Sequence, residues 1–69
     1  MVRYLEIISL EEGATAERSC ELLEQAGIPV IRRHIEIIRG NERLPGYAIL
    51  VPSQLCNQAQ SVIGISIAA

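Results

Sequence analysis

Hydrophobic and polar residues follow clear periods along most of this chain, and these periods predict its secondary structure. Residues 2–9 combine β-branched, aromatic and apolar residues in one short run, which is typical of a β-strand. The alternation sends Leu5 and Ile7 to one face and Val2, Tyr4 and Ile8 to the other. Because both faces are apolar, we expect this strand in the middle of a sheet or covered on both sides.

A helical period follows over residues 14–26. Ala16, Cys20, Leu23 and Ala26 recur at helical spacing and predict one buried face. Gly27 is expected at the C′ position, where a left-handed residue ends a helix. The start has two candidates, a cap by the Thr15 hydroxyl or a capping box over residues 9–12.

The period returns to two over residues 30–39. Ile31, Ile35 and Ile37 fall on one face of this predicted strand, and Arg32, His34 and Glu36 fall on the other. Residues 40–46 carry turn-forming types, and residues 47–51 read as a short buried strand before Pro52. We expect a hairpin with a loop of about six residues.

The last part of the chain predicts a second, shorter helix. Ser53 is a natural N-cap, and Leu55, Ala59, Val62 and Ile63 recur at helical spacing. Gly64 is expected to end this helix. Residues 65–69 are too few for periodicity to distinguish an edge strand from a loose tail.

The order of these elements predicts an α+β fold. A βαββα order, with or without a final strand, builds a ferredoxin-like plait or a shortened form of it, in which an antiparallel sheet carries two helices on one face. The 69 residues make one domain, residues 1–69, near the lower size limit for a single core. Domains this small often gain stability by self-association, so a homodimer is expected.

Charge is distributed unevenly along the chain. All six basic residues are Arg and all eight acidic residues are Glu, with Glu dominant in residues 1–24, Arg dominant in residues 32–43 and no charge in residues 44–69. The net charge of −2 argues against indiscriminate binding to nucleic acid or anionic lipid. With only Tyr4 and Tyr47 available for stacking, no nucleic-acid partner is expected. The apolar residues 62–69 are too few to cross a bilayer, so no membrane is expected either.

Cys20 and Cys56 are too few and too far apart for a disulfide framework. The chain also starts without the basic and apolar regions of a signal peptide, so a reducing cytoplasm is expected. Buried structural roles are the interpretation for both thiols. The spacing of Cys20, Cys56 and His34 does not fit a zinc site, and no metal or other cofactor is expected.

Two stretches resemble a known family. Residues 16–29 (AERSCELLEQAGIP), with a helix ending in Leu-Glu-x-x-Gly-Ile, and residues 47–52 (YAILVP), followed by Ala59, are similar to a bacterial family of signal-transducing domains in the PII-like plait superfamily. The resemblance implies the plait fold and a regulatory role. It implies no catalytic residues.

The basic cluster Arg32, Arg33, His34, Arg39 and Arg43 is the candidate binding site. Arginine presents a planar fork of donors that suits phosphate or carboxylate, so these residues could hold a small anion or an acidic protein segment. The alternative is a solvated strand face whose arginines pair with Glu36, Glu42 or the first helix.

No motif for catalysis accompanies this cluster. The chain has no Asp to orient an imidazole, no glycine-rich phosphate loop and no serine motif beside His34, so we do not expect an enzyme. The sequence leads to the hypothesis of a non-enzymatic regulatory or adaptor module. The alternative is a structural subunit that docks on a larger protein through its uncharged residues 44–69, because charge depletion is typical of interface cores.

Overall fold

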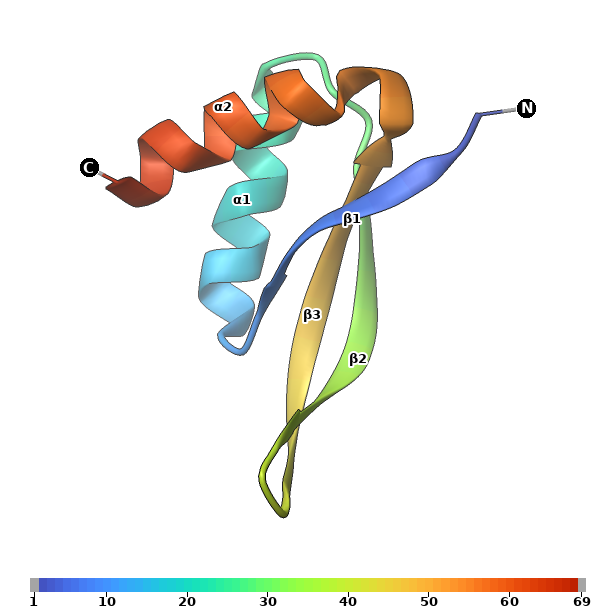
Figure 1. Ribbon diagram of the computed structural model, residues 1–69. Coiled ribbons are helices and arrows are strands. Elements are labelled where there is room, and N and C mark those ends of the chain that lie inside the picture. The colour runs from blue at the N-terminus through green and yellow to red at the C-terminus, as the bar shows by residue number, and fades with distance from the viewer. Residues whose placement is uncertain (1, 69) are drawn as a thin grey trace.

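The computed structural model describes the backbone of residues 2–68 and the side chains of residues 2–64 (Figure 1). The elements run β1 (Tyr4–Leu10), α1 (Gly13–Gln25), β2 (Ile31–Arg39), β3 (Glu42–Pro52), a short 3₁₀ helix η1 (Ser53–Leu55) and α2 (Cys56–Ala68). The three strands form one antiparallel sheet in the order β1-β3-β2. This is an α+β fold with the shortened βαββα arrangement that the sequence predicted.

The central strand is β3. Of the two expectations for the first strand, a central position or cover on both sides, the central position was wrong. Ile49 and Val51 of β3 are fully buried, whereas β1 pairs along one edge only. The two-sided apolar pattern of β1 has a local cause. Its register shifts between Glu6 and Ile8, and this irregularity lets both Ile7 and Ile8 pack against the core.

The hairpin between β2 and β3 is much tighter than predicted. Arg39 pairs with Glu42, so only Gly40 and Asn41 form the loop, and the expected loop of about six residues within positions 40–46 was wrong. Gly40 has φ 57° and Asn41 does not have positive φ, as a type II′ turn requires. The Gly-Asn pair is a recognised signal for this turn. Pro45 is tolerated in β3 because β1 ends opposite Tyr47, which leaves one side of β3 unpaired at Pro45.

Helix α1 ends as predicted and begins differently. The Gly27 N–H donates to the Glu24 carbonyl at 3.0 Å and the Ile28 N–H donates to the Leu23 carbonyl at 2.9 Å, which is the bond pattern of a Schellman motif. Gly27 supplies the left-handed residue, with φ 79°. At the other end the N-cap is Glu12, and its carboxylate accepts a 3.1 Å hydrogen bond from the Thr15 hydroxyl. Neither predicted cap therefore forms.

Helix α2 is longer than predicted. Gly64 does not end it, because the helix continues to Ala68, so residues 65–68 form neither a strand nor a loose tail. Residue 69, which the same prediction included, lies outside the described residues. Ser53 opens η1 instead of capping α2, and its backbone N–H donates to the Arg3 carbonyl at 2.7 Å. This hydrogen bond connects the residue after β3 to the residue before β1.

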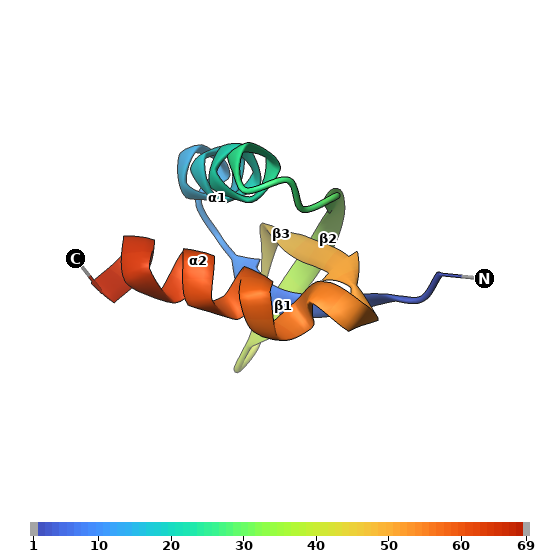
Figure 2. The same cartoon turned by 90° about the horizontal axis from the view of Figure 1, so that it is seen from above.

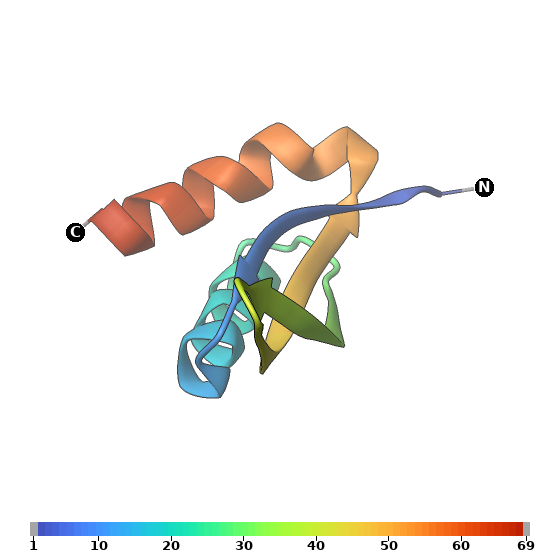
Figure 3. The ribbon, with the colours of Figure 1, turned by 60° about the horizontal axis from the view of Figure 1, so that its bottom comes forward.

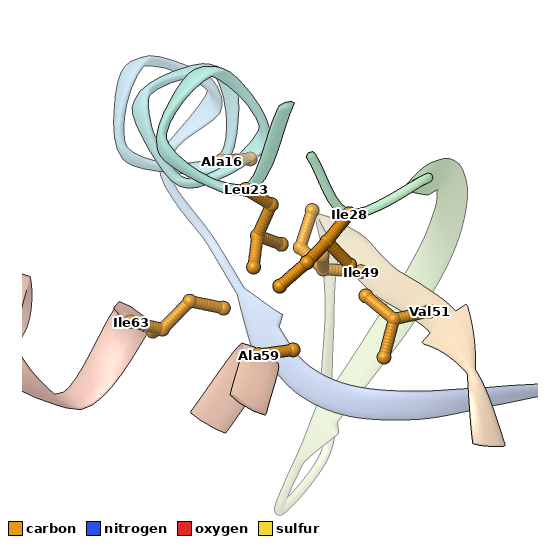
Figure 4. Close-up of a cluster of buried hydrophobic side chains, with 7 residues drawn as sticks. All are labelled: Ala16, Leu23, Ile28, Ile49, Val51, Ala59 and Ile63. Atoms are coloured by element: carbon orange, nitrogen blue, oxygen red, sulfur yellow. The ribbon is translucent and has the colours of Figure 1, made fainter. Parts of the chain in front are cut away.

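Both helices pack against one face of the sheet. The core is a single cluster in which side chains of α1, the α1–β2 connection, β3 and α2 converge (Figure 4): Ala16, Leu23, Ile28, Ile49, Val51, Ala59 and Ile63. Viewed along the strands, most of α1 and α2 lies on the same side of β2 (Figure 2). Because Ile49 and Val51 point to this side, the alternating residues Ala48 and Leu50 point to the other. The sheet therefore has one face under the helices and one face away from them.

Two glycine substitutions test the end of α1 at Gly27 and the continuation of α2 through Gly64. Gly64 lies inside α2 with open space where a Cβ would be, so Gly64→Ala should stabilise the protein by about 0.5–1 kcal/mol. Gly27→Ala should instead destabilise it by about 1–2 kcal/mol, because alanine is strained at positive φ. Urea unfolding monitored by circular dichroism measures both changes. Destabilisation by Gly64→Ala would contradict a helix that continues through this position.

Candidate functional site

The strand register divides the predicted basic cluster between the two faces of the sheet. Arg32 pairs with Ile49 and His34 pairs with Tyr47, so both lie on the face under the helices. Arg33 pairs with Ala48 and lies on the opposite face. All three side chains are exposed. The cluster is therefore not one convergent set of donors.

The Tyr47 ring contacts both Arg32 and His34, the two basic residues on the face under the helices. The Arg32 guanidinium carbon is 5.5 Å from the centre of the Tyr47 ring, and the His34 ring centre is 4.8 Å from the same ring. A Cβ built on Gly13, at the start of α1, would lie 3.4 Å from the Tyr47 hydroxyl, so this ring packs directly beneath the helix start. A cation over an aromatic face gains about 0.5–1 kcal/mol at exposed sites. The contact of Tyr47 with this cluster could not be predicted from the sequence, because it depends on the register of β2 and β3.

The two remaining arginines form ion pairs near the hairpin. Arg39 lies 2.8 Å from Glu11, and Arg43 lies 3.9 Å from Glu36. The alternative expected from the sequence, in which arginines pair with glutamates, describes Arg39 and Arg43. It included Glu36 as a partner, whereas Glu11 lies just before α1. Exposed pairs of this kind are worth only about 0–1 kcal/mol, so an incoming carboxylate could displace them.

An open pocket lies between α1 and the start of β2. It is lined by Glu17, Cys20, Glu21, Glu24, Val30 and Arg32. Three carboxylates thus surround one guanidinium, and this arrangement opposes the entry of a small anion. This pocket was not predicted from the sequence, although the spacing of Glu17, Glu21 and Glu24 already placed them along one side of the helix.

The outer edge of β2 presents backbone groups as well as side chains. Pro45 has no N–H, so its pair with Glu36 cannot be a hydrogen-bonded pair of the antiparallel ladder. Because these pairs alternate, the N–H and C=O groups of Arg32, His34 and Glu36 point away from β3. The strand order leaves β2 at the edge of the sheet with no neighbour on that side among residues 2–68. Such an edge can accept another strand.

The uncharged residues 44–69 belong largely to the interior. Residues 48–52 of β3 are buried, and Ala59 and Ile63 of α2 join the core. The exposed residues of α2 up to position 64 are polar or glycine, namely Asn57, Gln58, Gln60, Ser61 and Gly64. The lack of charge in this region is therefore explained by its central position, as far as the side chains are described.

Neither a metal-ligand group nor a membrane-spanning helix is found in the described part of the chain. No group of three or more His, Cys, Asp or Glu residues is placed to hold a metal ion. No described helix is long and apolar enough to cross a membrane. Both cysteines are free thiols.

Comparison with known proteins returns no match for this chain among family models, curated proteins or solved structures. The resemblance to PII-like signalling domains stays a prediction.

The position of Cys20 in the pocket predicts that its thiol is alkylated slowly. Burial, which disfavours the thiolate, raises the pKa of Cys20; Arg32 opposes this shift, and Glu24 and Glu17 add to it. Less thiolate is therefore present at neutral pH, and iodoacetamide should alkylate Cys20 more slowly in the folded protein than in urea. Mass spectrometry of the Cys20 peptide over a pH series measures the rates. Equal rates in both states across the series would contradict a shielded thiol.

Proposed function

We propose that this protein is a non-enzymatic regulatory or adaptor module of the cytoplasm that binds an extended acidic segment of a partner protein as an added strand along β2. The observation that carries this proposal is the unpaired edge of β2. Backbone N–H and C=O groups point outward along this edge, next to the basic side chains of Arg32, Arg33 and His34. Peptides that add a strand to a sheet edge gain affinity from main-chain hydrogen bonds and specificity from alternate side chains.

The separation of the arginines fits an extended segment better than a small anion. Successive side chains of a strand point to opposite faces, so an added acidic strand can offer one carboxylate to Arg32 or His34 and the next to Arg33. A small anion would need donors that converge, and Arg32 and Arg33 diverge. The carboxylates of Glu17, Glu21 and Glu24 further disfavour an anion in the adjoining pocket.

A peptide of matched design tests the proposal. An acetylated peptide in which Glu alternates with Val should bind, and its counterpart with Arg in place of Glu should not. The double variant Arg32→Glu, Arg33→Glu should weaken binding about tenfold or more, since two attractive contacts become repulsive. Arg18→Glu, an exposed charge reversal on α1, is the control and should leave the affinity within about twofold. Isothermal titration calorimetry measures all four cases.

Preferential binding of the Arg peptide would contradict the proposal, because it would assign recognition to the glutamates of α1. So would equal effects of the double variant and Arg18→Glu.

A proline substitution separates the backbone contribution from the side chain. The His34 N–H points away from β3, so His34→Pro should keep the β2–β3 ladder and lose one hydrogen bond to the added strand. We expect His34→Pro to bind the Glu peptide several-fold more weakly than His34→Ala, with both variants folded by circular dichroism. Equal affinity of these two folded variants would show that the edge backbone takes no part.

A further inference from the structure

The sheet face away from the helices carries a row of apolar side chains. The register pairs Ile31 with Leu50 and Ile37 with Leu44 on this face, and Ile35 lies between them opposite Gly46. We call these five residues, Ile31, Ile35, Ile37, Leu44 and Leu50, together with Ala48, the open face. Within residues 2–68 no helix lies on this side of β2 and β3 (Figures 2 and 3).

The open face is unusually apolar for a surface left to water. Antiparallel sheets normally alternate apolar residues toward the core with polar residues toward solvent. Strand β2 largely does the reverse, because Arg32, His34 and Glu36 lie on the helix side. Three of its isoleucines, Ile31, Ile35 and Ile37, lie on the open side together with Arg33 and Arg39, and only Ile38 lies on the helix side. Ile31 is 41% exposed there. Leu50 is only 8% exposed although the core cluster does not include it, so its shielding comes from the flanking strands.

We propose that the open face packs against the open face of a second copy of this chain in a two-fold symmetric dimer. The two sheets would stack face to face, as in a β-sandwich, and bury the isoleucines of both copies between them. This dimer contact and the proposed acidic segment share only Arg33. The dimer proposal rests on the apolar side chains of the open face, so its test does not depend on the proposed function.

Charge complementarity selects a second copy as the occupant. Glu6 pairs with Leu50 and therefore borders the open face on the β1 side. Arg33 lies on the β2 side of the same face, between Ile31 and Ile35 and opposite Ala48. Neither residue forms an ion pair within the described part of the chain. A two-fold axis parallel to the strands places the β1 border of one copy over the β2 border of the other. Glu6 and Arg33 of opposite copies are then about two residues apart along the strands, roughly 7 Å, which long side chains can span.

The size of the face sets the strength of this dimer. The paired strands extend over nine residues of β2, or about 30 Å, and three strands are roughly 15 Å wide with their side chains. Each copy thus contributes roughly 450 Å², and the total of about 900 Å² lies near the lower limit for a specific interface. We therefore expect a weak, concentration-dependent dimer. The outer edge of β2, with the helix-side Arg32 and His34, stays accessible in it.

A matched pair of substitutions on one strand tests the interface. Ile31→Glu places a charge inside the proposed contact and should raise the dimer dissociation constant about tenfold or more. Ile38→Glu is the control, because Ile38 is 69% exposed on the opposite face of the same strand. It should leave the dissociation constant within about twofold. Sedimentation equilibrium over a concentration series measures the constants, and circular dichroism checks that each variant is folded.

Charge reversal tests the symmetry of the dimer and does not alter the apolar contact. Glu6→Arg alone and Arg33→Glu alone should each weaken the dimer, since each places like charges opposite one another. The double variant restores opposite charges and should regain most of the wild-type affinity. A wild-type protein that stays monomeric at millimolar concentration would overturn the proposal. Equal effects of Ile31→Glu and Ile38→Glu, or no recovery in the double variant, would overturn it as well.

Discussion

The register of β2 on β3 is the constraint on which the remaining features depend. The two-residue turn at Gly40 and Asn41 sets this register, because it makes Arg39 and Glu42 the closing pair. A slip of one residue would exchange the two faces of β2. Arg32 and His34 would then leave Tyr47, and the isoleucines would turn toward the helices. The outer edge of β2, where we propose that a partner binds, and the open face are thus two consequences of one turn.

Much of the fold could be predicted from local patterns. The helix ending at Gly27 and the alternation of β2 follow from rules that act over a few residues, and the structure agrees with both. Three other features could not be predicted in this way, each for its own reason. Whether β1 or β3 is central is decided by pairing, and the length of the hairpin loop is decided by the Gly-Asn turn, which competed with Pro45 and Gly46 as a turn signal. Gly64 could continue a helix because nothing at that position requires a left-handed residue.

The candidate site was predicted in composition but not in geometry. The alternation already showed that Arg32 and Arg33 point to opposite faces, yet only the structure shows which of these faces lies under the helices. It also brings in Tyr47 and the glutamates of α1, which are far from β2 in the sequence. The sequence left a small anion and an acidic protein segment open as ligands, and these contacts are the reason why we propose the segment. They also leave the isoleucines on the side that no described helix covers.

The register can be measured directly by nuclear Overhauser effects between α-protons. In an antiparallel ladder the non-hydrogen-bonded pairs bring their Cα atoms to about 4.5 Å, close enough for a strong signal. The structure predicts strong α-proton contacts between His34 and Tyr47 and between Glu36 and Pro45. A strong contact from His34 to Ala48 in place of Tyr47 would show a shifted register, and the assignments of both the proposed binding edge and the open face would then be wrong.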